Sequence, residues 1–277
     1  MMIDRYRKFY ELAGKYYPED RLTYSSLSGI IRKKWVLNKL KKLPSGNLLD
    51  CGCNIGRLSS GWNKGMVIGV DIAYALLKKG KRIYPYINFV QGDLREIEFF
   101  KKDSIDNAIA IEVIEHLDRV DDFLNGLYKI LKPGGMVLIT TPSYSGKRPE
   151  MLKLGVLKSF GIKQGIEREY YFHTAYKPEE LRDIVVKSKF SVIEYGSFEF
   201  ELRGWVKPFT ILRNFFESIS DRIFPYSLLN ILIVEFLNRF EIDTFYILDT
   251  LGLGRLTKMF FKEGRRSYVL AKKVVCG

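Results

Sequence analysis

Short apolar segments alternate with segments of helical periodicity along the middle of the chain. The apolar segments span residues 47–50, 66–71, 87–93, 104–112 and 136–142, and most of them end in an acidic residue. Amphipathic helices are predicted over residues 73–82 and 117–131. This alternation predicts a parallel sheet that is covered by helices on both of its faces.

The flanking regions extend this pattern in both directions. Residues 1–47 predict two or three helices rich in Tyr, Lys and Arg, and residues 143–172 predict an irregular, basic and aromatic loop. A helix over 177–187, a strand over 190–195 parallel to the earlier strands, and a late strand over 267–275 follow. We therefore expect an α/β, Rossmann-like fold with seven mostly parallel strands, N-terminal helices and a helical insertion before the last strand. The predicted units are a helical cover (1–46), a core (47–200 and 265–277) and a helical cap (201–264).

The predicted cap is apolar and aromatic. Residues 227–237 are apolar on most sides, but this segment is too short to span a bilayer and contains Glu235. A small cap packed on the core is the simplest interpretation, whereas a substrate tunnel, a dimer surface or a monotopic membrane contact are alternatives. In its first half, five residues recur at helical spacing and predict one apolar stripe: Val206, Phe209, Leu212, Phe216 and Ile219.

Charge is unevenly distributed over the 277 residues, whose formal net charge is +13. Residues 1–47 hold 11 Lys or Arg against 4 Asp or Glu, whereas residues 201–264 hold 8 of each. A basic front favours an anionic partner, such as an acidic small molecule, anionic lipid or nucleic acid. Three cysteines and an N-terminus without an apolar centre indicate a cytoplasmic chain, with peripheral membrane attachment left open.

The stretch from 48 to 57 has the features of a ligand-binding loop. An apolar run ends at Asp50, and Gly52 and Gly56 follow where the backbone must turn. Amides at the start of a following helix favour an anion. Asp71 lies 21 positions after Asp50, which is the spacing of an acid that accepts hydrogen bonds from ribose hydroxyls. The glycine spacing fits a dinucleotide loop poorly, and no phosphate loop of Walker type is present.

Four stretches in order resemble the class I S-adenosylmethionine-dependent methyltransferases: residues 49–56, 69–71, 91–94, and 112–117 followed by 131–135. The resemblance covers roughly residues 45–200 and implies that S-adenosylmethionine is the cofactor. The family most often has Gly where this chain has Asn54, and Asn tolerates a left-handed backbone better than most residues.

The resemblance also implies which residues hold the cofactor. The glycine loop would approach its methionine part, Asp71 its ribose, and Asp93 with Leu94 its adenine. The alternative is that these acids only cap helices or turns. The full set assigned to the cofactor is Asp50, Gly52, Cys53, Asn54, Gly56, Asp71, Ile72, Asp93, Leu94 and Glu112.

The two histidines of the chain, His116 and His173, are both expected at the ligand-binding edge of the sheet. Glu112, Glu115 and His116 share one turn and, with His173, could hold Mg, Mn, Fe or Zn. This set resembles the metal site of small-RNA 2′-O-methyltransferases, and some similar quinone-biosynthesis O-methyltransferases need a divalent ion. Without a metal, His116 would be a base or a structural hydrogen-bond partner. The candidate catalytic residues are His116, Glu115 and His173.

These features together predict methyl transfer to oxygen or carbon of a small or lipid-like, anionic acceptor. The first alternative is a metal-assisted RNA 2′-O-methyltransferase, in which RNA would lie across the N-terminal helices and the loop at 147–163. The second is a non-catalytic cofactor-binding protein. Neither the acceptor nor the oligomeric state is predicted.

Overall fold

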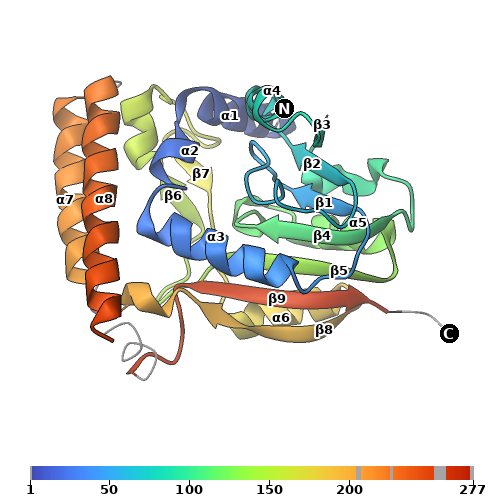
Figure 1. The fold of residues 1–277 in the computed structure, drawn as a ribbon. Coiled ribbons are helices and arrows are strands. Elements are labelled where there is room, and N and C mark those ends of the chain that lie inside the picture. The colour runs from blue at the N-terminus through green and yellow to red at the C-terminus, as the bar shows by residue number, and fades with distance from the viewer. Residues whose placement is uncertain (1, 204–206, 225–226, 253–259, 275–277) are drawn as a thin grey trace.

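The structure is a computed structural model that describes residues 2–203, 207–224, 227–252 and 260–274. Its centre is a seven-stranded sheet with the strand order β3-β2-β1-β4-β5-β9-β8 (Figure 1). Strand β9 is antiparallel to both of its neighbours, and the other strands run parallel to one another. The predicted Rossmann-like fold is therefore confirmed. The strands are β1 (Leu48–Cys51), β2 (Val67–Asp71), β3 (Asn88–Gln91), β4 (Ile105–Ile111), β5 (Leu131–Pro142), β8 (Phe190–Phe198) and β9 (Arg266–Lys273).

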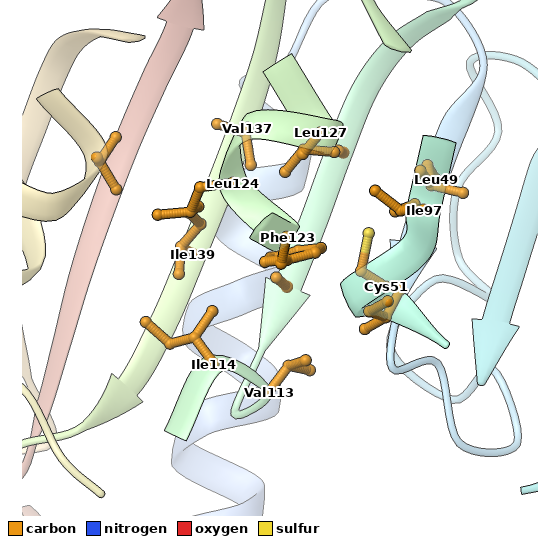
Figure 2. Packing of buried hydrophobic residues seen from close by; sticks show 14 of the residues in the cluster. Leu49, Cys51, Ile97, Val113, Ile114, Phe123, Leu124, Leu127, Val137 and Ile139 are labelled. Atoms are coloured by element: carbon orange, nitrogen blue, oxygen red, sulfur yellow. The ribbon is translucent and has the colours of Figure 1, made fainter. Parts of the chain in front are cut away.

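Side chains along each central strand point alternately to the two faces of the sheet, so each strand contributes to the buried cluster on both faces. Leu49 of β1 joins one buried cluster and Leu48 joins the other, because successive side chains point to opposite faces. On the first face, Phe123 and Leu127 of α5 (Val120–Ile130) pack over Val137 (Figure 2). That cluster also includes residues of α6 (Pro178–Lys187).

The N-terminal helices cover the second face and the edge of the sheet. They are α1 (Met2–Tyr16), α2 (Glu19–Leu22) and α3 (Leu27–Leu40). Val36 and Leu40 of α3 pack in the second buried cluster with Leu48 and Ile109. Helix α1 contacts α4 (Tyr74–Ile83), which follows β2. These helices therefore close over the edge of the sheet where β1, β2 and β4 end (Figure 1).

The segment at 143–172 is more ordered than expected. It forms a two-stranded ribbon of β6 (Met151–Lys153) and β7 (Tyr170–Phe172), with the short 3-10 helix η3 (Gly155–Phe160) between them. Three-residue strands leave too little periodicity to be read from sequence. Helix α5 begins after another short turn, η2 (Ile114–His116), and two further 3-10 turns are η1 (Leu94–Phe99) and η4 (Phe200–Arg203).

The predicted cap is a hairpin of two helices, α7 (Lys207–Ile223) and α8 (Leu228–Thr250), which lie side by side (Figure 1). The predicted apolar stripe lies on α7, mostly on its exposed side. Leu212, Phe216 and Ile219 are exposed and Phe209 is half-buried, whereas Val206 lies outside the described residues. Polar side chains fill the seam between the two helices instead, because they satisfy one another by hydrogen bonds and ion pairs. Within the described residues, no helix is long and apolar enough to cross a membrane.

Candidate active site

A cavity of about 280 Å³ lies at the carboxyl ends of β1, β2 and β4, under the N-terminal helices. Such an edge is where open α/β sheets bind ligands. Eight of the predicted residues line it: Gly52, Asn54, Asp71, Ile72, Asp93, Leu94, Glu112 and His116. The N-terminal helices and the turns between them contribute residues that were not predicted: Tyr6, Phe9, Tyr10, Tyr17, Glu19, Tyr24 and Arg32.

The glycine loop after β1 has the backbone that its sequence predicts. Gly52 has φ +69°, and a Cβ there would lie 2.5 Å from Val113. Asn54 has φ +53°, so the asparagine does adopt the left-handed conformation. Its side chain accepts a hydrogen bond from the amide of Ile55 (2.7 Å) and donates one to Glu19 of α2 (2.7 Å). Asn54 therefore shapes the loop and joins it to the N-terminal cover.

Three predicted loop residues lie behind the loop and do not line the cavity. Asp50 is buried and accepts a hydrogen bond from Ser59 (2.6 Å), and burial raises its pKa to about 7. Cys53 fills the space beside Gly69, and Gly56 lies against Ile87 and Phe89. These residues support the conformation of the loop, while Gly52 and Asn54 face the cavity.

Asp71 at the end of β2 lines the cavity and also caps two turns. Its carboxylate accepts hydrogen bonds from the amides of Asn54 (2.8 Å) and Ala73 (2.9 Å). Burial raises its pKa, although these amide donors act in the opposite direction. The capping alternative and a ligand-binding role are thus compatible, since each carboxylate oxygen has a second lone pair.

Asp93 caps η1 by accepting from the amide of Arg95 (2.9 Å), and it also forms an ion pair with the guanidinium of Arg95 (2.6 Å). Burial alone would raise the pKa of Asp93, but the hydrogen bonds from Arg95 outweigh it and hold the pKa below its usual value. The carboxylate is therefore ionised on the cavity wall, with Leu94 beside it.

Glu112 follows β4 with φ +59° and lies in an ion-pair network. Arg32 of α3 (3.2 Å) and Arg266 of β9 (2.9 Å) both contact its Oε2, and Thr140 donates to its Oε1 (2.9 Å). The buried Nε of Arg32 has no partner. Among the described residues, Arg32 is the one cation that lines the cavity, which favours an anionic group there.

The two histidines meet beside this network. The rings of His116 and His173 are 4.8 Å apart and nearly perpendicular, and Nε2 of His116 is 4.0 Å from the carboxylate of Glu115. Ligand atoms of these three residues lie within 4.8 Å of one another. One atom of each is buried without a hydrogen-bond partner: Oε2 of Glu115, Nδ1 of His116 and Nδ1 of His173.

The predicted set of four metal ligands is therefore divided. Glu115, His116 and His173 converge, whereas the carboxylate of Glu112 is held by two arginines. Burial lowers the pKa of His116 to about 3 and also lowers that of His173. Both imidazoles are thus neutral and able to donate a lone pair.

An aromatic wall stands on the other side of His116. The ring of Tyr10 lies 5.8 Å from that of His116, and Phe9 stacks on Tyr171 at 5.2 Å. The hydroxyl of Tyr6 donates a hydrogen bond to the backbone carbonyl of His116. The cavity wall next to the histidines is therefore largely aromatic.

Comparisons with known proteins agree with this geometry. A family model described as a methyltransferase domain matches residues 49–139. A ubiquinone biosynthesis O-methyltransferase of Rickettsia typhi is 25% identical over 238 residues, which cover 78% of this chain and 92% of that protein. A sterol 24-C-methyltransferase of Kluyveromyces lactis is 27% identical over 190 residues, or 63% and 48% of the two chains. The crystal structure of an S-adenosylmethionine-dependent methyltransferase from Mesorhizobium loti has a TM-score of 0.55 at 14% identity, and covers 89% of this chain and 99% of that one.

The chain is a class I S-adenosylmethionine-dependent methyltransferase.

The sequence contained signals for some of the unpredicted residues of this methyltransferase. Tyr6, Phe9 and Tyr10 recur at i, i+3 and i+4, so they form an aromatic stripe on α1 that faces the cavity. The pairing of Glu112 with Arg32 and Arg266 had no such signal, because only the packing of α3 and the place of β9 in the sheet bring these residues together.

Proposed function

We propose that this methyltransferase transfers a methyl group to oxygen or carbon of a small or lipid-like, anionic acceptor. The observation that carries the proposal is the composition of the cavity: His116 shares its wall with Tyr6, Phe9, Tyr10 and Tyr171. Aromatic side chains bind flat or apolar molecules through large contact areas, and the few polar groups fix orientation. The net charge of +13 of the chain as a whole favours an acceptor with negative charge.

The names of the relatives support the same class of acceptor. One is an O-methyltransferase of ubiquinone biosynthesis and the other methylates carbon 24 of a sterol. We prefer a lipid-like acceptor over RNA because the acceptor side of the cavity is aromatic and lies under α1, α2 and α3.

The lining residues fit S-adenosylmethionine. The guanidinium of Arg32 lines the cavity and can bind a carboxylate, and the space beside Gly52 has no room for a Cβ atom. Asp71 retains lone pairs for ribose hydroxyls, and Asp93 is ionised for an amine donor. When bound, the cofactor supplies a methyl group on a sulfonium, which is already an activated leaving group.

The role of the protein in the reaction is then positioning and proton removal. The aromatic wall would hold the acceptor atom in line with the methyl group, which can supply much of the acceleration. His116 lines the cavity, and its neutral imidazole would take the proton from the acceptor hydroxyl or carbon. Because the N-terminal cover lines the cavity, it would limit the access of water to the reacting atoms.

A divalent ion at Glu115, His116 and His173 is a second proposal for the same site. It is supported by three converging donors, each with a buried atom that lacks a partner. An ion held there would act as a Lewis acid that lowers the pKa of an acceptor hydroxyl. Under this proposal His116 is a ligand, and the proton of the acceptor goes to another group or to water.

The acceptor class can be tested with S-adenosylmethionine that carries a radiolabelled methyl group. The enzyme is incubated with the organic-extractable, small polar and RNA fractions of a cell extract. We expect label in the organic or small polar fraction, and we expect His116→Asn to lose transfer while still binding the cofactor. Label in RNA alone would overturn the proposed acceptor.

A further inference from the structure

The side of the α7–α8 hairpin that faces away from the protein is covered by large apolar side chains. We call it the outer face. Residues spaced by about one helical turn share one side of each helix. Those that define the outer face are Ile211, Phe215 and Ile219 of α7 and Phe236, Phe240 and Ile247 of α8, with exposures between 37% and 70%. Exposed apolar surface of this extent marks an interaction site.

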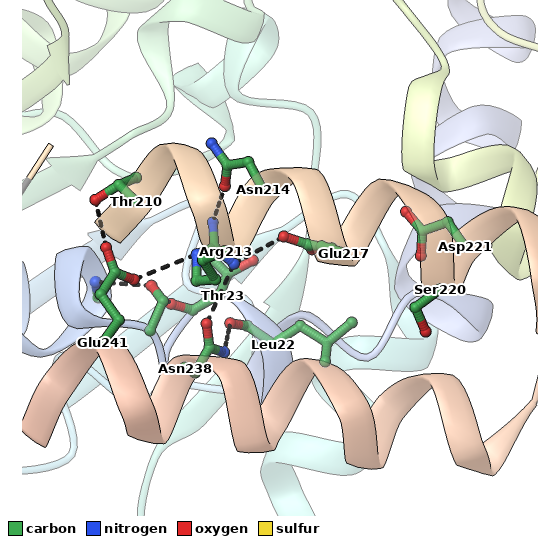
Figure 3. Close-up of polar contacts among 12 residues, drawn as sticks. Leu22, Thr23, Thr210, Arg213, Asn214, Glu217, Ser220, Asp221, Asn238 and Glu241 are labelled. Atoms are coloured by element: carbon green, nitrogen blue, oxygen red, sulfur yellow. Dashed lines mark hydrogen bonds and ion pairs between the residues drawn. The ribbon is translucent and has the colours of Figure 1, made fainter. Parts of the chain in front are cut away.

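The seam between the same two helices is polar. Arg213 of α7 forms ion pairs with Glu217 (2.7 Å) and with Glu241 of α8 (3.2 Å), as Figure 3 shows. Further along, the buried Asn230 accepts a hydrogen bond from Ser220 (2.7 Å) and donates one to Asp221 (2.8 Å). The hairpin thus has its polar groups satisfied inside and its apolar groups outside.

This polarity is the reverse of that expected for a helical pair in water, where the apolar side is buried. It matches an apolar environment, because hydrocarbon solvates exposed apolar side chains and leaves polar groups to pair with one another. No described helix can span a bilayer, so the contact is with its surface. The exposed ion pair of Arg239 with Asp243 (3.0 Å) also lies among these side chains, which indicates shallow insertion.

The charge of the chain favours a bilayer over a second copy of the chain as the partner of the outer face. Two copies of a chain with a net charge of +13 repel each other at long range, although residues 201–264 themselves hold as many acidic as basic residues. Lys207 and Arg222 are exposed near the two ends of α7, and Lys153 and Lys163 are exposed on the segment whose helix η3 contacts α7. Anionic lipid headgroups attract such a cationic surround, each Lys or Arg near the surface contributing about 1 kcal/mol.

We propose that the outer face docks the enzyme on the surface of a bilayer that contains anionic lipid. Helix α8 would lie in the plane of the interface, with Phe236 and Phe240 among the acyl chains close to the headgroups. The opposite side of α8 packs on the cover of the cavity, where Val234 contacts the cluster of Leu22 and Phe160, with Tyr17 beside it. Docking would therefore place the cover of the active site one helix layer from the lipid.

The test is sedimentation of the full chain with vesicles of phosphatidylcholine alone or mixed with phosphatidylglycerol. We expect binding to the mixed vesicles that weakens as salt rises. The triple variant Phe215→Ser, Phe236→Ser, Phe240→Ser should bind at least tenfold more weakly. The matched control is Val186→Ser with Ile193→Ser, which removes exposed apolar side chains from α6 and β8 and should bind like the wild type.

Two results would overturn the proposal. One is a wild-type chain that stays in the supernatant with the mixed vesicles. The other is a wild-type dimer in light scattering that the triple variant converts to a monomer, since a second copy would then cover the face. If the triple variant does not fold, Phe236→Ser alone serves, because Phe236 is the most exposed of the six side chains. Vesicle binding is measured without acceptor or turnover, so its outcome is separate from that of the proposed function.

Discussion

Arg32 and Glu112 join the N-terminal cover to the edge of the sheet, with a nitrogen of the guanidinium 3.2 Å from an oxygen of the carboxylate. Arg32 belongs to α3, and Glu112 follows β4 on the cavity wall. Both side chains are largely buried, and Arg266 shares the same carboxylate oxygen. The buried carboxylate of Glu199 lies 3.4 Å from Arg266, so two arginines and two glutamates form one ion-pair network, and Arg32 of this network lines the cavity.

Arg32→Met should weaken the binding of S-adenosylmethionine, because Arg32 is a cation on the cavity wall. A charge-assisted hydrogen bond to a carboxylate contributes about 1.5–3 kcal/mol, so we expect a loss of roughly tenfold or more by calorimetry. Arg32→Lys should recover part of the affinity. The control is Lys34→Met, which removes an exposed charge from the same helix. Equal affinity of the wild type and the Arg32 variant would remove this residue from the cofactor site.

Asp71→Ala should abolish most cofactor binding. The variant loses an acceptor for ribose hydroxyls and releases the amides of Asn54 and Ala73, so we expect a loss of about a hundredfold. Asp106→Ala is a matched control, because Asp106 also accepts a backbone amide, that of Asn47 (2.9 Å), but does not line the cavity. If both variants bind as the wild type does, the ribose assignment is wrong.

Asp50 should make stability depend on pH. Its pKa is raised to about 7 in the folded protein, against 3.8 as its ordinary value. The folded state therefore holds a proton that the unfolded chain releases between these values. The resulting stability is fully present below the lower value and is lost as pH rises through about 7.

The measurement is urea denaturation of the wild type and Asp50→Asn between pH 5 and pH 8. The free energy of unfolding of the wild type, relative to the variant, should fall by up to about 1.4 kcal/mol per pH unit below pH 7 and level off above it. A difference between the two proteins that does not change with pH would contradict a buried, protonated Asp50.

The three converging donors predict a metal site that can be detected without turnover. Dialysis against Co²⁺ should give visible absorption bands of a bound ion, and His173→Ala should abolish them. Glu112→Gln should keep them, because Glu112 is held by Arg32 and Arg266 and does not belong to the converging group. Loss of the bands in Glu112→Gln would instead restore the set of four ligands, and no bands in the wild type would leave His116 as a base.

The strands and the glycine loop could be predicted because local sequence determines them. Leu48 and Leu49 alternate between two buried clusters, and Asn54 takes the one unusual conformation that its side chain tolerates. The α7–α8 hairpin shows a property that local sequence does not determine. Helical spacing identified Leu212 and Phe216 as neighbours on α7, but periodicity alone does not say which side of a helix faces the protein.

The active site shows a second limit of prediction from the sequence. Asp71 ends β2 and Asp93 comes two residues after β3, so their place at the cavity was foreseeable. Arg32 and Arg266 meet at Glu112 from opposite parts of the chain, and no spacing rule connects them. Such contacts follow from the packing of α3 and β9 beside β4 and β5, which sequence periodicity does not specify.

The position of β9 also means that the sheet is completed only late in the synthesis of the chain. This strand pairs with β5 on one side and β8 on the other, yet it follows both along the chain. During synthesis, β5 and β8 leave the ribosome with unpaired edges, and they acquire their shared neighbour only when residues 266–273 emerge. Because Arg266 is part of β9, the ion pair that it forms with Glu112 at the cavity wall is completed at the same late step.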